Sequence, residues 1–234
     1  MSDPATELIT FHGWGFSPEI WSEWEQRLAG SVAVQHGNRG YFGEPNIPSF
    51  TGNSARNVVM THSFGLHWCP KSLLKEADTL VVLSGFLSFH PSDPGGERRS
   101  RLIVRQMMSH FVEKPLEVLN QFYQNVYSPE ESPDNTPGPM DHDRLLADLE
   151  RLNSSQLNPK QFADVNEVII IHGSGDQIVS NERARDLYSL LLSKARYFEV
   201  KEGGHAVGFC RIGECIRFLN PIFHNEPEVS RDEP

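Results

Sequence analysis

Three short segments of the sequence each hold one residue of a type used in nucleophilic catalysis. Ser63 lies in THSFG, Asp176 ends HGSGD, and His205 ends GGH. A serine hydroxyl is a weak nucleophile at neutral pH and needs an adjacent base. A histidine can be that base, because its pKa lies near the working pH, and an aspartate can fix its tautomer. The three residues therefore predict a Ser-His-Asp hydrolase.

Each of these residues follows a segment that we expect to be a strand. The three strands are 58–61, 168–171 and 197–200. The carboxyl ends of parallel strands meet at one edge of a sheet, which would bring the three side chains together. A serine at a sharp turn between strand and helix, followed along the chain by Asp and then His, is a known order for such sites.

The remaining pattern favours an α/β fold. Helical segments alternate with short apolar strands, and the strands are expected at 7–11, 32–35, 58–61, 79–83, 168–171 and 197–200. Such alternation is typical of a mostly parallel sheet covered by helices on both faces. We predict about six strands, with a helix over 64–77 that is restarted or kinked at Pro70, another over 181–193 and a last one over 211–219.

The middle of the chain does not fit this alternation and is predicted to be a helical lid. Residues 97–127 have helical periodicity, with Ile103, Phe111 and Leu116 on the expected apolar face, and a further helix surrounds 145–152. We therefore assign 1–85 and 161–224 to the core and 86–160 to the lid. Residues 225–234 form a polar, acidic segment that is expected to be a disordered tail.

An acyl-transfer reaction also needs backbone donors for the developing oxyanion. The N–H of Phe64, directly after the proposed nucleophile, is one candidate. The N–H of Trp14, in the loop after the first strand, is the other. The dipole of the helix that follows Ser63 is expected to favour the same negative charge.

The motifs FHGWG, THSFG, HGSGDQIV and GGHA resemble those of the α/β-hydrolase superfamily. More narrowly, the chain resembles the pimeloyl-[acyl-carrier protein] methyl ester carboxylesterases of biotin synthesis. That resemblance implies removal of the methyl group from pimeloyl-acyl-carrier protein methyl ester, with an acyl-carrier protein as partner. One departure is Thr61, which stands where G-x-S-x-G has its first glycine, and its Cβ calls for local adjustment.

The expected lid carries a group of basic residues. Arg98, Arg101 and Arg105 recur at helical spacing and are predicted to share one face, in a chain whose formal net charge is −10. Such an island can attract an acidic carrier, although a solvated helix face is the simpler interpretation. Phe111 is a candidate to contact an acyl chain, with packing of the lid on the core as its alternative.

Composition restricts the possible functions. The acidic balance argues against nucleic-acid binding. The sequence has no run of eighteen apolar residues, so we expect no membrane-spanning helix. No His, Cys or carboxylate spacing indicates a metal site, and we expect no cofactor. Three scattered cysteines suggest reduced thiols in a cytoplasmic protein, which we expect to be a monomer.

Two other functions stay open at this stage. One is a general carboxylesterase or thioesterase that acts on small acyl compounds. The other is a non-catalytic binding protein built on a hydrolase fold, for which Thr61 is the best support.

Overall fold

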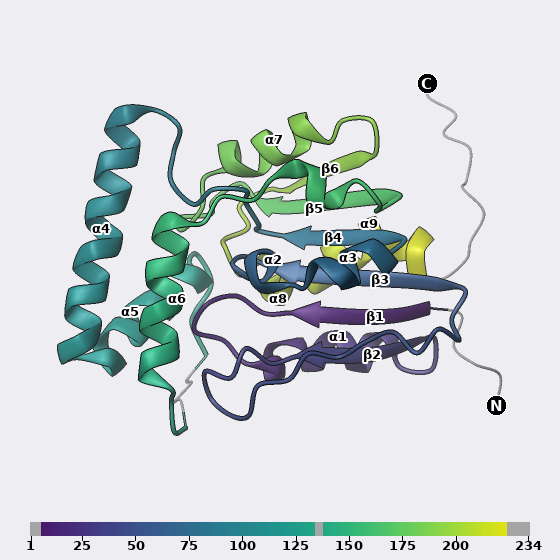
Figure 1. Ribbon diagram of the computed structural model, residues 1–234, viewed down its shortest axis with the longest axis horizontal. Helices are drawn as coiled ribbons and strands as arrows, with labels where there is room; N and C mark the ends of the chain where they lie inside the picture. The colour runs from purple at the N-terminus through teal and green to yellow at the C-terminus, as the bar shows by residue number, and fades with distance from the viewer. Residues whose placement is uncertain (1–5, 134–137, 224–234) are drawn as a thin grey trace.

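The structure is a computed structural model that describes residues 6–133 and 138–223. A six-stranded sheet forms the centre of this part of the chain (Figure 1). All neighbouring strands are parallel, in the order β2-β1-β3-β4-β5-β6. The prediction of about six mostly parallel strands is confirmed, whereas the predicted tail at 225–234 lies outside the described residues. The strands are β1 (Thr6–Phe11), β2 (Val32–Gly37), β3 (Arg56–His62), β4 (Thr79–Leu83), β5 (Glu167–Gly173) and β6 (Ala195–Val200).

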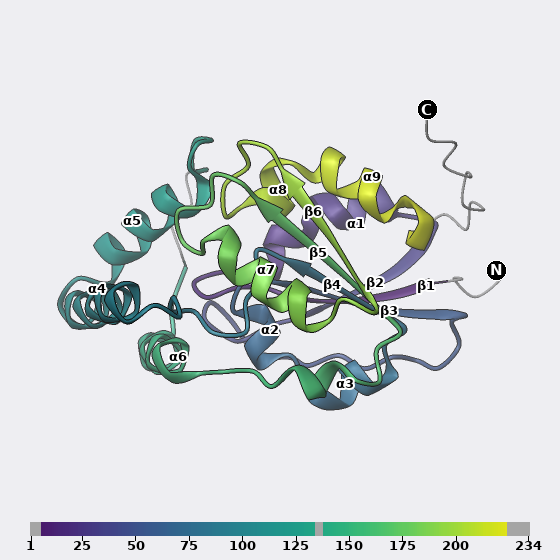
Figure 2. The same ribbon diagram turned by 90° about the horizontal axis from the view of Figure 1, so that it is seen from above.

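Alternation along the central strands gives the sheet two apolar faces. Helices lie on both sides of the sheet (Figure 2). Leu8 and Met60 pack with Trp24 on one face, and Ile9 and Val59 pack with the helices of the other face. The first face is covered by α1 (Ser22–Leu28), α8 (Val207–Cys210) and α9 (Ile212–Phe223), and the second by α2 (Gly65–Trp68), α3 (Lys71–Glu76) and α7 (Asn181–Leu190). Two 3₁₀ turns, η1 (Pro18–Trp21) and η2 (Pro159–Phe162), complete the core.

Some predicted helix bounds need correction. The helix over 64–77 restarts at Pro70, which is one of the two expected alternatives: it consists of α2 and α3, because Pro70 has no N–H to continue the ladder. The helix expected to reach residue 193 ends at Leu190, and the last helix continues past 219 to Phe223.

The lid lies beyond the carboxyl ends of the strands, at the left of Figure 1. It consists of α4 (Pro94–Glu113), α5 (Pro115–Tyr127) and α6 (His142–Ser154). The single helical run expected over 97–127 is divided at Lys114 and Pro115. The predicted apolar face was also partly wrong, because Ile103 and Leu116 are 58% and 49% exposed. Helix α4 packs on α5 and α6, and the buried side chains on its inner face are those of Val104 and Phe111.

A buried ion pair ties the lid to the core. Asp148 of α6 is 2% exposed and accepts two hydrogen bonds from Arg39, at 2.6 and 2.8 Å, in the loop that follows β2. The hydroxyl of Tyr41 donates to the same carboxylate at 2.8 Å. Arg144, also in α6, donates to the carbonyl of Arg39. A bidentate pair on a buried carboxylate fixes the angle at which α6 meets the core.

We expect Asp148→Ala to lower the free energy of unfolding by about 2–4 kcal/mol, because the change leaves Arg39 and Tyr41 without their shared acceptor. Equilibrium urea denaturation measures this loss. Glu150→Ala, at an exposed position of the same helix, is the matched control and should change stability by no more than about 0.5 kcal/mol. Equal unfolding midpoints for the two variants would show that the pair does not hold the lid.

Candidate active site

The turn after β3 places Ser63 in a strained backbone conformation. Ser63 has a φ of 53°, and its N–H donates to the carbonyl of Leu83 at the end of β4. The left-handed region is unfavourable for a residue with a side chain and is typically found where function requires it. Gly65 permits the turn, because a Cβ there would overlap the carbonyl oxygen of Phe11. The result is a serine side chain turned away from both strand and helix.

The three predicted residues meet at the carboxyl edge of the sheet. Nε2 of His205 lies 2.9 Å from Oγ of Ser63, and Nδ1 of His205 lies 2.7 Å from Oδ2 of Asp176. Ser63 is 6% exposed, His205 is fully buried, and so is the side chain of Asp176. With the Ser63 hydroxyl donating to Nε2 and Nδ1–H donating to Asp176, the imidazole is in the tautomer that can accept the serine proton.

The surroundings of Asp176 keep its carboxylate ionised. Burial opposes ionisation, but the attraction of His205 and hydrogen bonds from His172 and His205 hold the pKa of Asp176 well below its usual range. The other oxygen, Oδ1, accepts the N–H groups of Ile178 and Val179 at 2.8 and 2.9 Å. The acid is therefore held in one orientation by donors on both of its oxygens.

Two further histidines contact this group, and neither was predicted from the sequence to take part in catalysis. His62 donates from Nε2 to the carbonyl of His205 at 3.1 Å, and burial, followed by repulsion from His205, keeps its pKa well below the usual value. His172 lies 3.1 Å from Oδ2 of Asp176. Their positions beside Ser63 and in HGSGD were the available signals, but spacing alone does not show where a ring points.

The loop after β1 passes next to the turn at Ser63. A Cβ on Gly13 would lie 2.9 Å from Nδ1 of His62 and 3.1 Å from Cβ of Ser63, so only glycine allows this approach. In the described part of the chain, the N–H groups of Trp14 and Phe64 have no protein acceptor. Neither of the two predicted donors is therefore engaged in a backbone hydrogen bond there. The expected helix dipole needs correction, because α2 has only four residues, and the individual N–H groups must provide the stabilisation.

Thr61 is accommodated inside the sheet. Its side chain is fully buried, and its hydroxyl lies 3.4 Å from the carbonyl of Val81 in β4. The departure from G-x-S-x-G therefore leaves the turn at Ser63 intact.

Aromatic side chains of the lid cover the site. The indole N–H of Trp14 donates to the carbonyl of Leu145 in α6 at 2.8 Å, and the ring packs edge-on against Phe111 and Phe122, with centroids 6.0 and 4.9 Å away. The hydroxyl of Tyr123 donates to the carbonyl of Gly15. Phe111 is only 2% exposed. It therefore packs from α4 of the lid against Trp14, and packing is its main contact in this structure.

The predicted arginines do not all point the same way. Arg98 and Arg105 are exposed on α4. Arg101 is half-buried, forms an ion pair with Glu97 at 2.8 Å and donates to the carbonyl of Asn153 in α6. It also lines a cavity of about 510 Å³ between α4 and α7, together with Arg183. Only Arg98 and Arg105 of the three present their charge freely to solvent.

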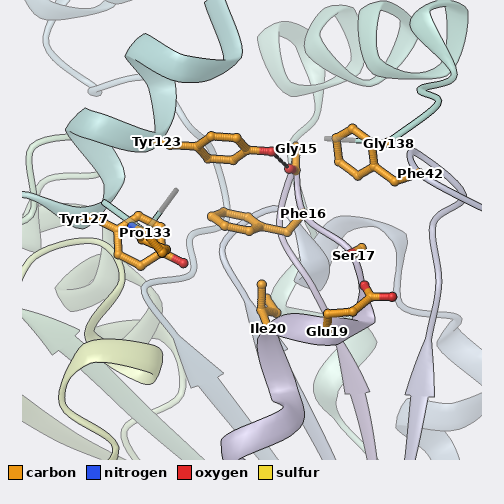
Figure 3. A pocket seen from close by; sticks show the side chains of 10 residues that line it. All are labelled: Gly15, Phe16, Ser17, Glu19, Ile20, Phe42, Tyr123, Tyr127, Pro133 and Gly138. Carbon is orange, nitrogen blue, oxygen red and sulfur yellow. Dashed lines mark hydrogen bonds between the residues drawn. The ribbon is translucent and has the colours of Figure 1, made fainter. Parts of the chain in front are cut away.

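A separate cavity of about 420 Å³ lies on the outer side of the loop after β1 (Figure 3). Phe16 and Tyr123 lie one above the other in it, with Tyr127 on one side and Phe42 on the other. Ser63, Asp176 and His205 do not line this cavity, so we do not assign it to the site. In full, its lining is Gly15, Phe16, Ser17, Glu19, Ile20, Phe42, Tyr123, Tyr127, Pro133 and Gly138.

Residues 6–133 and 138–223 contain no group of three His, Cys, Asp or Glu side chains placed to hold a metal ion. Within the same ranges, no helix has the length and apolar character needed to cross a membrane.

Comparisons with known proteins agree with this fold. The sequence matches no protein-family model and no curated protein. Its structure is similar to a bromoperoxidase from Bacillus anthracis (TM-score 0.74, 15% identity, 96% of this chain and 93% of that one). It is also similar to an esterase from Exiguobacterium antarcticum (TM-score 0.69, 13% identity, 94% of this chain and 92% of that one). An esterase from a Rhodococcus species is similar as well (TM-score 0.65, 16% identity, 94% of this chain and 90% of that one). The geometry and these similarities together identify the fold of this chain as the α/β-hydrolase fold.

Proposed function

We propose that this protein is a serine carboxylesterase that acts through Ser63, His205 and Asp176. The observation that carries the proposal is the hydrogen-bonded chain from Ser63 Oγ to His205 and from His205 to Asp176, at 2.9 and 2.7 Å. It stands beside two backbone N–H groups that have no acceptor in the described structure. A non-catalytic binding protein would not require a serine at a φ of 53° in contact with a base.

The reaction follows from this geometry. His205 takes the proton of Ser63 as Oγ attacks the ester carbonyl, and the N–H groups of Trp14 and Phe64 bind the oxyanion. Asp176 stabilises the imidazolium. The imidazolium then protonates the departing alcohol, which leaves an acyl group on Ser63. Water, deprotonated by His205, releases the acid and restores the serine.

Replacing any member of the triad tests this mechanism. We expect Ser63→Ala to reduce kcat for p-nitrophenyl acetate about ten-thousandfold or more, and Asp176→Asn and His205→Ala to reduce it by several orders of magnitude. The losses should not add in double variants, because the three groups act as one unit. A fluorophosphonate should label the wild type on Ser63 and leave Ser63→Ala unlabelled. Hydrolysis at the wild-type rate by Ser63→Ala would refute the assignment.

For the substrate, we propose the methyl ester of pimeloyl-acyl-carrier protein, in biotin precursor synthesis in the cytoplasm. The motif resemblance supports this substrate, as does an α4 that presents Arg98 and Arg105 to solvent in an acidic chain. The ester must reach Ser63 beneath the lid, whereas a carrier protein would remain outside it. A general carboxylesterase of small substrates is the second candidate, favoured by the similarity to known esterases.

The two candidate functions predict different ratios of kcat/KM for carrier-bound and free methyl esters. If the carrier substrate is right, kcat/KM should be at least about tenfold higher for the carrier-bound ester, because docking adds binding energy. The gene should also restore growth without biotin to a strain that cannot make the pimeloyl precursor, and its Ser63→Ala form should not. Equal kcat/KM for both esters, without complementation, would favour the general esterase.

The arginines provide an independent test of carrier docking. We expect Arg98→Ala combined with Arg105→Ala to raise KM for the carrier-bound ester about tenfold and to weaken its salt dependence, since exposed charge pairs are screened by salt. Adding Arg101→Ala should change KM little further, because that side chain is engaged with Glu97 and Asn153. Activity on p-nitrophenyl acetate serves as the control and should stay near wild type. An unchanged KM would mean that these residues form an ordinary solvated face.

A further inference from the structure

We propose that His172 is a positioning residue that fixes the loop carrying the acid of the triad, so that the Asp176 carboxylate stays turned towards His205. This inference rests on the proposed function, because it concerns the acid of that mechanism.

The ring of His172 bridges the beginning and the end of the acid loop. Its Nε2–H donates to the carbonyl of Val179 at 2.9 Å and lies 3.1 Å from Oδ2 of Asp176. The N–H of Val179 in turn donates to Oδ1 of Asp176 at 2.9 Å. Oδ2 is also the oxygen that accepts Nδ1–H of His205. One imidazole nitrogen therefore faces the same oxygen as the proposed base and closes the turn that orients it.

The other ring nitrogen argues against a role in packing alone. His172 is fully buried, and its Nδ1 has no hydrogen-bond partner in the described part of the structure. Burying an unpartnered polar atom is unfavourable, and a phenyl ring would fill similar space without that penalty. The contacts made by Nε2 are the physical reason for a histidine here.

The position of His172 suits this role. It belongs to β5 and pairs with Glu199 of β6, so its backbone is fixed by the sheet. Asp176 lies beyond the strand, in the loop between β5 and α7. A side chain anchored on a rigid element can hold a loop residue within the narrow range of geometry that catalysis needs.

The charge balance around the pair gives the expected pH effect. The titratable groups that face Asp176 and His205 are His172 from β5 and His62 from β3. Removing the His172 N–H would leave the carboxylate with fewer donors and a stronger attraction for the imidazolium of His205. The acidic limb of kcat/KM, which reports protonation of the base in the free enzyme, should then move to higher pH.

The experiment compares the pH profiles of His172→Phe and His172→Gln on p-nitrophenyl acetate. For His172→Phe we expect kcat to fall about tenfold or more, with the midpoint of the acidic limb at higher pH. His172→Gln should recover most of kcat and a midpoint near wild type, because its amide can donate from the position of Nε2. If His172→Phe does not fold, His172→Asn replaces it, since the shorter amide does not reach that position.

His90→Phe is the matched control. His90 is also buried, and its Nε2 lies 3.1 Å from the carbonyl of Asn153, away from the triad. The His90→Phe variant should leave the midpoint of the acidic limb of the pH profile unchanged. A wild-type midpoint in the His172 variants that lack the donor, or an equal shift in His90→Phe, would overturn the inference even if kcat fell.

The wild type separates this inference from the proposed function. If Ser63 reacts with a fluorophosphonate and the wild type hydrolyses esters, a normal pH profile for His172→Phe defeats only the positioning role. If Ser63 does not react and no ester is hydrolysed, the proposed function fails, and the inference falls with it.

Discussion

A serine at a φ of 53° needs neighbouring backbone that leaves room for its turn and holds it in place, and this requirement shapes the whole site. Gly13 and Gly65 provide the room, because a Cβ at either position would collide with the turn or with β1. The Ser63 N–H is held by the carbonyl of Leu83 in β4. The strain is thus supported by the central strands of the sheet, and it is what directs Oγ towards His205.

The same loop after β1 links the turn to the lid. His12 donates to the carbonyl of Gly13 through Nδ1 and accepts the N–H of Arg39 through Nε2. Burial lowers the pKa of His12 to about 4, which keeps Nε2 an acceptor at neutral pH. Arg39 also binds Asp148 of α6. One residue, Arg39, therefore connects the loop that carries a proposed oxyanion donor to helix α6 of the lid.

Burial defines the electrostatics of the site. Asp176 remains ionised because four donor contacts surround its two oxygens. The pKa of His62 is held well below its usual value because burial, together with repulsion from His205, outweighs the attraction of Asp176. The proposed base thus has one carboxylate on one side and a neutral ring on the other. Titratable groups perturbed in this way are typical of functional sites.

The sequence by itself determined the strand order along the chain, the parallel sheet and the meeting of Ser63, Asp176 and His205, because residues that follow parallel strands must share one edge of the sheet. It could not decide which residues on the lid helices face inward. Ile103 and Leu116 fit an apolar period but are exposed, because the contact with α5 and α6 selects Val104 and Phe111 instead. Only the tertiary structure brought His172 to Asp176 and Arg39 to Asp148. The first contact depends on the direction of a side chain, and the second also depends on bringing together residues far apart in the sequence, and no local pattern encodes either.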